Sequence, residues 1–540
     1  MRCAHPYLKF VENYGAEPTY RPLLDPLSAP SMVFGPGLDF FWEKRSTLFQ
    51  NAGKTVITLE PKVWGSPIMC TNSLAVVRQI TGPSWRKPDW YSNLVLLEIE
   101  DSHWPIRVVE SVSFWGHNLL SSQLDEGWRK HRRILQPAFN NKLYEDVWNE
   151  STRLCHGMLG VEHFPTSPGG AVSVSNLYKL TARFTLCVIL ACGFGYPLAW
   201  DEKLRTPDED ITIDEGIAFN SENLILVTYA PRWLFKLPIK KCDLGPHETV
   251  TNFWKTAVHR PCHQRYANLV QRIIGLKETR SCGSNQRGEE DLETELVKRD
   301  IFTRLALASQ MQGKYHLNDD ELNVWVQMFA GHETSASALA SCLCFLAMHK
   351  GEQDIVYEEI QTVLKTTTDG RFSFEHYDQL VKTRSAFVEA LRLVPPANLI
   401  IRESKDDCIL QASRRGPDGS MEQHSVLVPK GAIMVVDFIG MHYDPETFPN
   451  PTEFQPSRWY DASTDEAYSP FSTGPRVCIG RRFALVESVA FLCSVLKDYK
   501  VEPFLKAGET ADAWSTRVLQ RVNCRLTMAL ANTPLTFKRR

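Results

Sequence analysis

The sequence predicts a mainly α-helical protein with small β-sheets, an α+β fold in which one large domain is expected. Helical periodicity dominates residues 120–350 and continues up to Leu393, which predicts the helical body. Residues 54–60 alternate and are rich in β-branched side chains, so they predict a strand, and residues 67–71 predict its partner. Beyond residue 397 the chain is divided into short strand and turn patterns. The strand-rich part should therefore combine segments from both ends of the sequence.

The helices expected at particular places follow in chain order. They lie at residues 41–52, 74–80, 318–348 and 481–497, with strands from there to the C-terminus. The helix at 318–348 begins with a capping pair, Asn318 and Glu321, and its roughly 30 residues would span about 45 Å. It is apolar on nearly every face, so it should be central and buried. Residues 277–299 predict an exposed loop, and Pro395 ends the helical region.

Composition excludes several classes of function. The chain has 60 Lys and Arg against 63 Asp and Glu, a net charge of −3, which does not suit bulk binding of nucleic acid. A hydrophobic share of 43% with 23% charged residues excludes a disordered chain. The 14 cysteines include no Cys-x-x-Cys pair, and several lie in apolar helical runs, where cysteine behaves as a small hydrophobic residue. We therefore expect a globular protein of a reducing compartment.

The expected domain boundaries follow from local composition. Residues 1–39 predict an irregular N-terminal segment without a signal-peptide core or an anchor helix. Residues 184–200 form an uncharged run, but two glycines and a proline interrupt it, so we interpret it as a buried helix and its exit turn. The catalytic domain is expected at residues 40–535, followed by a basic tail at 536–540.

Cys478 lies in a glycine-flanked loop just before the predicted helix at 481–497. Backbone N–H groups and the helix dipole at such a place favour a thiolate over a thiol. A thiolate in this setting can serve as an axial ligand of haem iron. For a lone cysteine, a buried structural role would be the preferred interpretation. That preference is reversed because the cysteine belongs to a longer pattern of five spaced residues. They are Phe471, Gly474, Arg476, Cys478 and Gly480.

These five positions resemble the Phe-x-x-Gly-x-Arg-x-Cys-x-Gly signature of the cytochrome P450 haem-thiolate monooxygenases, and the similarity extends over about residues 40–535. The resemblance implies the single-domain fold of that family, with haem b between the long central helix and the cysteine loop. It implies that Cys478 is the axial ligand and that Phe471, Gly474 and Gly480 shape the loop around the haem. Electrons would come from NADPH through a separate reductase.

A second motif lies in the middle of the helix at 318–348. A mid-helix glycine such as Gly331 costs about 1 kcal/mol relative to alanine, so it needs a reason, and a helix-packing role is the plain alternative. Together with Ala330 it resembles the family's oxygen-activating motif. The resemblance implies that Thr334 orders a proton-delivering water, that Glu333 supplies protons, and that Ala330 and Gly331 leave space over the iron.

Glu389 and Arg392 share one helix face at a spacing of three residues. They match the family's Glu-x-x-Arg, and Arg458 is expected as the third member, from a segment in which Ser457 and Trp459 replace the family's Glu and Phe. The resemblance implies a buried carboxylate with two guanidinium groups that fixes the cysteine loop, which is a structural role.

Haem propionates would be bound by four basic or donor side chains, by resemblance Trp128, Arg132, Arg402 and Arg476. A solvated basic helix is the alternative for the cluster at residues 128–133, and it applies in part to Arg129, Lys130 and Arg133. A basic face on the thiolate side should attract an acidic reductase. Its members are Arg129, Lys130, Arg133, Arg481 and Arg482.

The expected substrate is a hydrophobic small molecule, because the pocket lining implied by resemblance is mostly apolar and includes Ala330, Gly331, Ala397 and Ile400. The local sequences of several segments resemble those of membrane-type family members from higher fungi. We therefore expect fungal secondary metabolism, with terpenoid biosynthesis as the first hypothesis and fatty acids, polyketides and xenobiotics still open. A monomer bound peripherally to the cytosolic side of the endoplasmic reticulum is expected.

Three questions stay open at this stage. A haem-thiolate isomerase or dehydratase and a non-enzymatic haem protein are the alternative functions, and the Glu333–Thr334 pair argues against both. Residues 95–114 lengthen the family's usual connection and are either a real insertion or a gene-model artefact. Whether an N-terminal anchor was lost is also undecided.

Overall fold

A computed structural model gives the fold. It describes residues 39–59, 68–81, 90–92, 119, 126–195, 197–202, 301, 324–367, 370–404, 406–416, 418–461, 470–524 and 527–540. The predicted loop at 277–299, the segment 95–114 and the predicted cap at Asn318 lie outside these residues.

The chain divides into two compact units. The first comprises Met1–Ile106, His163–Ala182 and Glu333–Arg540, and the second comprises Arg107–Glu162 and Arg183–His332. Helices predominate among the described residues and the sheets are small, which confirms the predicted fold class. No helix in the described part of the chain is both long and apolar enough to cross a membrane.

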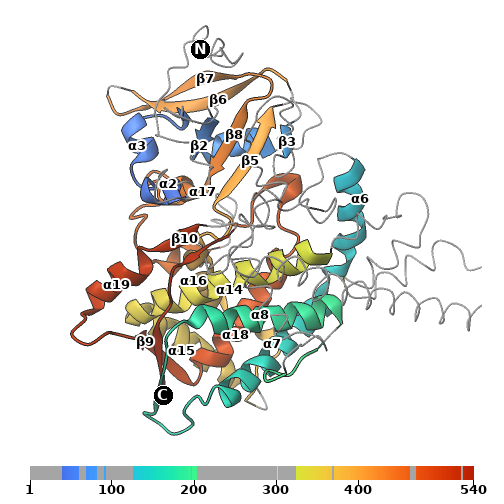
Figure 1. Cartoon of the computed structure of the whole chain (residues 1–540), viewed down its shortest axis with the longest axis vertical. Helices are drawn as coiled ribbons and strands as arrows, with labels where there is room; N and C mark the ends of the chain where they lie inside the picture. The colour runs from blue at the N-terminus through green and yellow to red at the C-terminus, as the bar shows by residue number, and fades with distance from the viewer. Residues whose placement is uncertain are drawn as a thin grey trace, which may run out of the picture. The chain divides into compact units, whose positions relative to one another are not determined.

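The main sheet of the first unit has five strands in the order β1-β2-β8-β5-β3 (Figure 1). The strands are β1 (Val56–Leu59), β2 (Ile68–Thr71), β3 (Trp90–Ser92), β5 (Leu399–Ser404) and β8 (Ile433–Asp437). All pairs are antiparallel except β2 with β8, where Met69 lies opposite Met434. The sheet thus joins segments from both ends of the sequence, as predicted.

Smaller sheets complete the first unit. They are the hairpin of β6 (Cys408–Arg415) with β7 (Met421–Val428), the pair of β10 (Val522–Cys524) with β11 (Met528–Leu530), and the sheet of β4 (Ala171–Val174), β12 (Leu535–Arg539) and β9 (Tyr499–Pro503). The strand β12 is central in its sheet. Residues 536–538, which belong to the predicted basic tail, are therefore paired on both sides.

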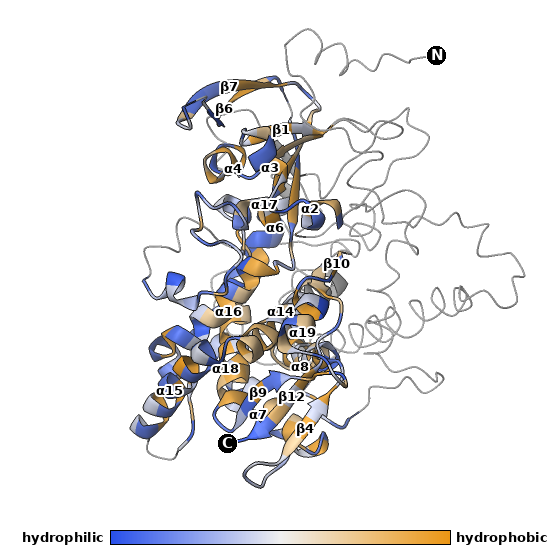
Figure 2. Cartoon of the chain, turned by 90° about the vertical axis from the view of Figure 1, so that its left-hand side faces the viewer, coloured by the Kyte–Doolittle hydropathy of each residue, from blue (hydrophilic) through white to orange (hydrophobic). Residues whose placement is uncertain are grey.

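The first unit contains eight complete α-helices among its described residues, besides parts of α8 and α14. They are α2 (Asp39–Glu43), α3 (Leu48–Ala52), α4 (Leu74–Thr81), α15 (Lys350–Thr366), α16 (Val381–Leu393), α17 (Phe438–His442), α18 (Arg481–Leu496) and α19 (Ala511–Leu519). Burial in α18 is nearly continuous from Leu485 to its end, so it lies in the core. In contrast, α15 alternates hydrophilic and hydrophobic segments, as expected for a helix with one buried face (Figure 2).

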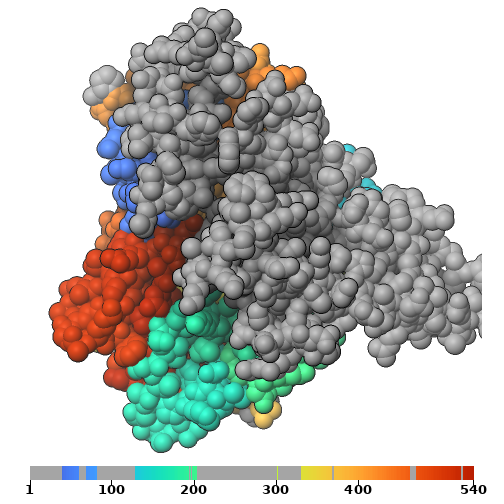
Figure 3. All heavy atoms as spheres, viewed as in Figure 1, coloured from blue at the N-terminus to red at the C-terminus, as the bar shows by residue number. Residues whose placement is uncertain are grey.

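Two sequence predictions need correction. The helix predicted at 41–52 is divided into α2 and α3, because a turn at residues 44–47 interrupts it and the Arg45 guanidinium bonds the Trp42 carbonyl at 2.7 Å. The expectation of only strands after residue 497 is wrong, since α19 forms there. The Thr510 side chain accepts a hydrogen bond from the Ala513 N–H and caps it. Its outer residues are exposed at the surface (Figure 3).

The second unit is helical where it is described. It contains α6 (Glu126–Leu135), α7 (Asn141–Val161), the larger part of α8 (Leu177–Phe194) and the start of α14 (Val324–Met348). The Asn140 side chain caps α7 by accepting from the Leu143 N–H at 3.1 Å. Thr185 of α8 donates to the His332 carbonyl of α14 at 2.9 Å, which fixes these two helices against each other.

Candidate active site

The cysteine loop is a compact double turn that precedes α18. The Cys478 N–H donates to the Phe471 carbonyl at 2.9 Å, and the Val477 N–H donates to the Gly474 carbonyl at 3.0 Å. Ser472 and Gly474 have φ values of 65° and 74°, in the left-handed region that favours glycine. These turns bring Cys478 to the start of α18, where Gly480 is the N-cap residue.

Cys478 differs from the other described cysteines in exposure. Ten cysteines are described, none of them in a disulfide, and nine of them are buried while Cys478 is exposed. Burial raises the pKa of buried thiols such as Cys408 and Cys493, which keeps them neutral and unreactive. Cys478 is therefore the described thiol that an external group can reach, and it lies near a helix N-terminus.

Gly480, two residues after the cysteine, leaves open space beside the sulfur. A Cβ added to Gly480 would meet a single heavy atom within 4 Å among the described residues, the Sγ of Cys478 at 3.9 Å. A flat group could thus approach the sulfur and the bare backbone together. Arg476 forms part of a short 3₁₀ helix (Gly474–Arg476) in the same loop.

The helix α14 carries the predicted proton-relay residues. Glu333 is buried, Thr334 is half-buried, and both belong to the first unit, as does the cysteine loop. The next residue, Ser335, lies beside the carboxyl of Glu487 on α18. This contact places the segment of α14 at residues 333–335 against the helix that follows Cys478.

Glu487 is a buried acid that the sequence analysis missed. Its side chain is fully buried, and no described group meets hydrogen-bond geometry with either carboxyl oxygen. Burial raises its pKa well above the ordinary value, although the nearby Ser335 hydroxyl opposes this, so the protonated form is favoured. A signal existed in the sequence, because Glu487 interrupts an apolar run of α18.

Gly331 has a packing contact in the second unit. A Cβ on it would come within 3.2 Å and 3.3 Å of the Ile189 side chain of α8. The glycine therefore allows close approach of two helices, as in the helix-packing alternative considered from sequence. Ala330 precedes it on the same helix and is half-buried.

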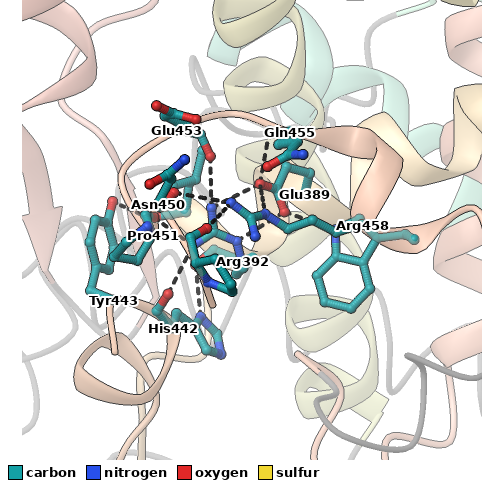
Figure 4. A network of polar contacts seen from close by, with 12 residues as sticks. Glu389, Arg392, His442, Tyr443, Asn450, Pro451, Glu453, Gln455 and Arg458 are labelled. Atoms are coloured by element: carbon teal, nitrogen blue, oxygen red, sulfur yellow. Dashed lines mark hydrogen bonds and ion pairs between the residues drawn. The ribbon is translucent and has the colours of Figure 1, made fainter. Parts of the chain in front are cut away.

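Glu389, Arg392 and Arg458 are brought together by the structure (Figure 4). Arg392 donates from Nε to Glu389 Oε2 at 2.9 Å and from Nη2 to Oε1 at 2.8 Å, a bidentate pair with both side chains fully buried. The Nε of Arg458 lies 3.4 Å from Glu389 Oε1. Arg392 also donates to the carbonyls of His442, Pro451 and Glu453.

Trp459 joins this network, which the sequence analysis missed. Its Nε1 donates to Glu389 Oε2 at 2.8 Å, and the Gln455 N–H donates to Oε1 at 2.9 Å. The signal was the replacement of the family's Phe by Trp, because an indole adds an N–H donor that a phenyl ring lacks. The carboxylate thus receives bonds from α16 and from the segment at 455–459.

The remaining predicted residues lie in separate parts of the fold. Arg402 of β5 is buried, donates to the Ile401 carbonyl at 2.9 Å, and has its pKa lowered to about 10 by burial. Ile400 packs against the hydrophobic core of the main sheet, while Ala397 is exposed. Trp128 and Arg132 lie on α6 in the second unit.

Comparison with known proteins decides the family. A model of the family described as Cytochrome P450 matches residues 98–527, most of the chain. The chain belongs to the cytochrome P450 family. It is therefore an oxidoreductase of the haem-thiolate monooxygenase class, with a cysteine-ligated haem b that typically receives electrons from NADPH through a reductase.

Individual P450 proteins resemble the chain at modest identity. Cytochrome P450 monooxygenase 124 of Postia placenta is 28% identical over 446 residues, covering 81% of this chain and 79% of that protein. Human Cytochrome P450 4A11 is 29% identical over 417 residues, covering 74% and 70%. A crystal structure of a cytochrome P450DA heme domain matches with a TM-score of 0.64 at 18% identity, covering 96% and 98%, and so supports the P450 fold.

The described residues fit a haem of the P450 type. The exposed sulfur of Cys478, the open space beside Gly480 and the buried guanidinium of Arg402 supply a thiolate donor, room for a flat ring and a cation for a carboxylate. Burial of Arg402 lowers its pKa, so an anion bound beside it would relieve an unfavourable charge burial.

Proposed function

We propose that Cys478 is the thiolate ligand of the haem and that the enzyme inserts one oxygen atom from O₂ into a hydrophobic small molecule. The observation that carries this proposal is that Cys478 is exposed just before α18, whereas the other nine described cysteines are buried. When bound, a thiolate-ligated haem supplies the oxygen-activating chemistry of this class.

Residues of this chain would hold the haem and manage protons. Arg402 and Arg476, with Trp128 and Arg132, would bind its propionates. Phe471, Gly474 and Gly480 would shape the loop at the sulfur. The triad around Glu389 would fix the backbone that supports this loop, because Arg392 and Arg458 bind carbonyls of residues 449–453.

Thr334 and Glu333 would deliver protons to the reacting oxygen. Their support is positional, since Ser335, the next residue, contacts α18, the helix that follows the cysteine loop. The Thr334 hydroxyl can hold a water, and the buried Glu333 carboxyl can exchange a proton with it. Ala330, Gly331, Ala397 and Ile400 would line the substrate side, with Gly331 also packing on Ile189.

The substrate class is proposed as a fungal secondary metabolite, with terpenoids first. The Postia placenta relative supports a fungal setting by its source, and it is named as a monooxygenase. A monomer bound to the cytosolic face of the endoplasmic reticulum, reduced by an acidic partner, completes the proposal. Arg481 and Arg482 support the docking face, because they begin the helix that follows the loop of the exposed cysteine.

Reconstitution tests this function. The haem-loaded protein, a P450 reductase and NADPH are incubated with a panel of terpenoids, fatty acids and polyketides under labelled O₂. One labelled oxygen atom should appear in the product of an accepted terpenoid, with NADPH consumed in step. Conversion of a hydroperoxide without NADPH, and no labelled product from any compound, would instead indicate an isomerase or dehydratase.

A further inference from the structure

The loop before Cys478 rests against the C-terminal end of α4. A Cβ added to Gly474 would overlap the carbonyl oxygen of Thr81 and lie 3.1 Å from its carbonyl carbon. Backbone atoms cannot move aside as a flexible side chain can, so this position excludes every side chain. Glycine is therefore required at position 474 for two reasons, the close approach of the Thr81 carbonyl and a φ of 74°.

A hydroxyl pair links the same two elements. Thr81 Oγ1 lies 2.7 Å from the Val77 carbonyl and 3.2 Å from Thr473 Oγ1. A hydroxyl has one proton, and the shorter contact to a carbonyl takes that of Thr81. Thr473 must therefore donate to Thr81 across the contact between α4 and the loop.

Thr473 uses its hydroxyl in an unusual way for its position. It is the N-cap residue of the 3₁₀ helix Gly474–Arg476, where a threonine normally accepts a bond from its own helix. No such bond forms here. The hydroxyl contacts Thr81 instead, so the bond that would stabilise the loop locally is replaced by one to α4.

The end of α4 is a firm support. Val76, Val77 and Ile80 are buried in the core of the main sheet. On another face, the Gln79 amide donates to the Gln411 carbonyl at 2.8 Å and accepts from the Gln411 N–H at 2.9 Å. Thr81 is therefore held by both the sheet and the β6–β7 hairpin.

We infer that Thr81 is a positioning residue for the thiolate loop, acting through the hydroxyl of Thr473 and the backbone of Gly474. The α4 helix then sets where Cys478 presents its sulfur, and the bond to Thr473 resists displacement of the loop. The inference rests on Cys478 being the haem ligand and is independent of the substrate.

The test measures how firmly the thiolate ligation is held. Haem-loaded Thr81→Val, Thr473→Val and the double variant are reduced under carbon monoxide in mild urea. The loss of the red-shifted Soret band of thiolate ligation is then followed in time. Each single variant should lose the band about fivefold faster, the effect of one neutral hydrogen bond. The double variant should be no faster than either, because both changes remove the same bond.

Two further variants separate positioning from general stability. Thr81→Ser keeps the hydroxyl and should restore the wild-type rate. Thr362→Val removes a matching bond to the carbonyl four residues earlier, 2.7 Å long, on α15, and should leave the rate unchanged. Equal rates for wild type, Thr81→Val and Thr473→Val would overturn the inference, as would equal acceleration by Thr362→Val. Absence of the thiolate band in the wild-type protein would overturn the ligand assignment as well.

Discussion

At the scale of single residues, environment rather than residue type separates the functional groups from the structural ones. Cys478 and Cys493 are only 15 positions apart, yet one thiol is exposed in a loop and the other is buried in α18. The loop could be predicted from sequence because its glycines and arginine surround the cysteine locally. Glu487 could not be placed in this way, because its relation to Ser335 depends on how α18 packs on α14.

Asp437 gives a prediction for pH dependence. Burial raises its pKa to about 7, although the Gly440 N–H donates to Oδ1 at 2.9 Å. In the unfolded chain the carboxyl has its ordinary pKa of about 3.9. Between these values the unfolded state releases its proton first, so the free energy of unfolding should fall as the pH rises from about 4 to about 7, by on the order of 4 kcal/mol.

Asp437→Asn should remove this slope, because the amide keeps an oxygen for Gly440 and cannot ionise. Urea unfolding of the haem-loaded wild type and variant at about pH 5 and about pH 7 measures this pH dependence of the unfolding free energy. An equal change in unfolding free energy for both proteins would show that Asp437 does not titrate in this range.

Thr334→Ala tests the proposed proton relay. The variant should load haem and bind substrate, because Thr334 is only half-buried and its loss opens little space. It should consume NADPH while releasing hydrogen peroxide in place of product, with coupling lower by about 10²-fold or more if general acid–base assistance is lost. Thr334→Ser keeps the hydroxyl and should stay coupled. Full coupling in the alanine variant would rule out the relay.

At the scale of elements, helices with strong local signals were predicted and those defined by contacts were not. The helices α4 and α18 lie within a residue or two of their expected limits, and α16 ends at the predicted Leu393, because prolines, glycines and apolar runs mark these places. The turn between α2 and α3 depends on Arg45, which stacks over Trp42 and Tyr443 at 4.1 Å and 5.3 Å. Such a distant partner leaves no local trace in the sequence.

The missed helix α19 had a readable signal. Thr510 is an N-cap residue, and Trp514 and Val518, four positions apart, are its fully buried side chains. The expectation of a strand-rich C-terminus outweighed this pattern.

The network around Glu389 allows a matched test with two tryptophans. Trp459→Phe removes a bond to a buried carboxylate, which should lower the free energy of unfolding by about 1.5–3 kcal/mol. Trp514→Phe is the control, because the buried Trp514 Nε1 has no hydrogen-bond partner among the described residues. Urea unfolding should therefore show a larger loss for Trp459→Phe than for Trp514→Phe. Similar losses would show that ring volume alone matters at both sites.

At the scale of the whole molecule, the positive charge beside Cys478 is a local feature of a chain that is nearly neutral overall. The net charge is −3, while Arg481 and Arg482 stand together just after Cys478. Their side chains lie over aromatic rings, Arg481 over Phe471 at 6.0 Å and Arg482 over Phe374 at 5.9 Å. This arrangement holds two cations near the exposed cysteine, on the face where we propose that the reductase docks.

Arg482→Glu should slow reduction by an acidic reductase and weaken its dependence on salt, since charges separated by more than about 10 Å are screened at 0.1 M. Substrate binding should be unchanged. Arg521→Glu is the control, because Arg521 is exposed next to β10 and remote in sequence from the cysteine loop. Stopped-flow reduction at low and high salt measures the reduction rate and its salt dependence for both variants. Equal slowing by the two variants would show that net charge, and not this site, governs docking.

The central claim is that Cys478 ligates the haem through its thiolate. The absorption spectrum of the reduced protein under carbon monoxide tests it directly, with Cys478→Ala and the buried Cys493→Ala compared with wild type. The wild-type protein and Cys493→Ala should show the red-shifted Soret band of thiolate ligation, and Cys478→Ala should lack it. The same band in Cys478→Ala would contradict the account.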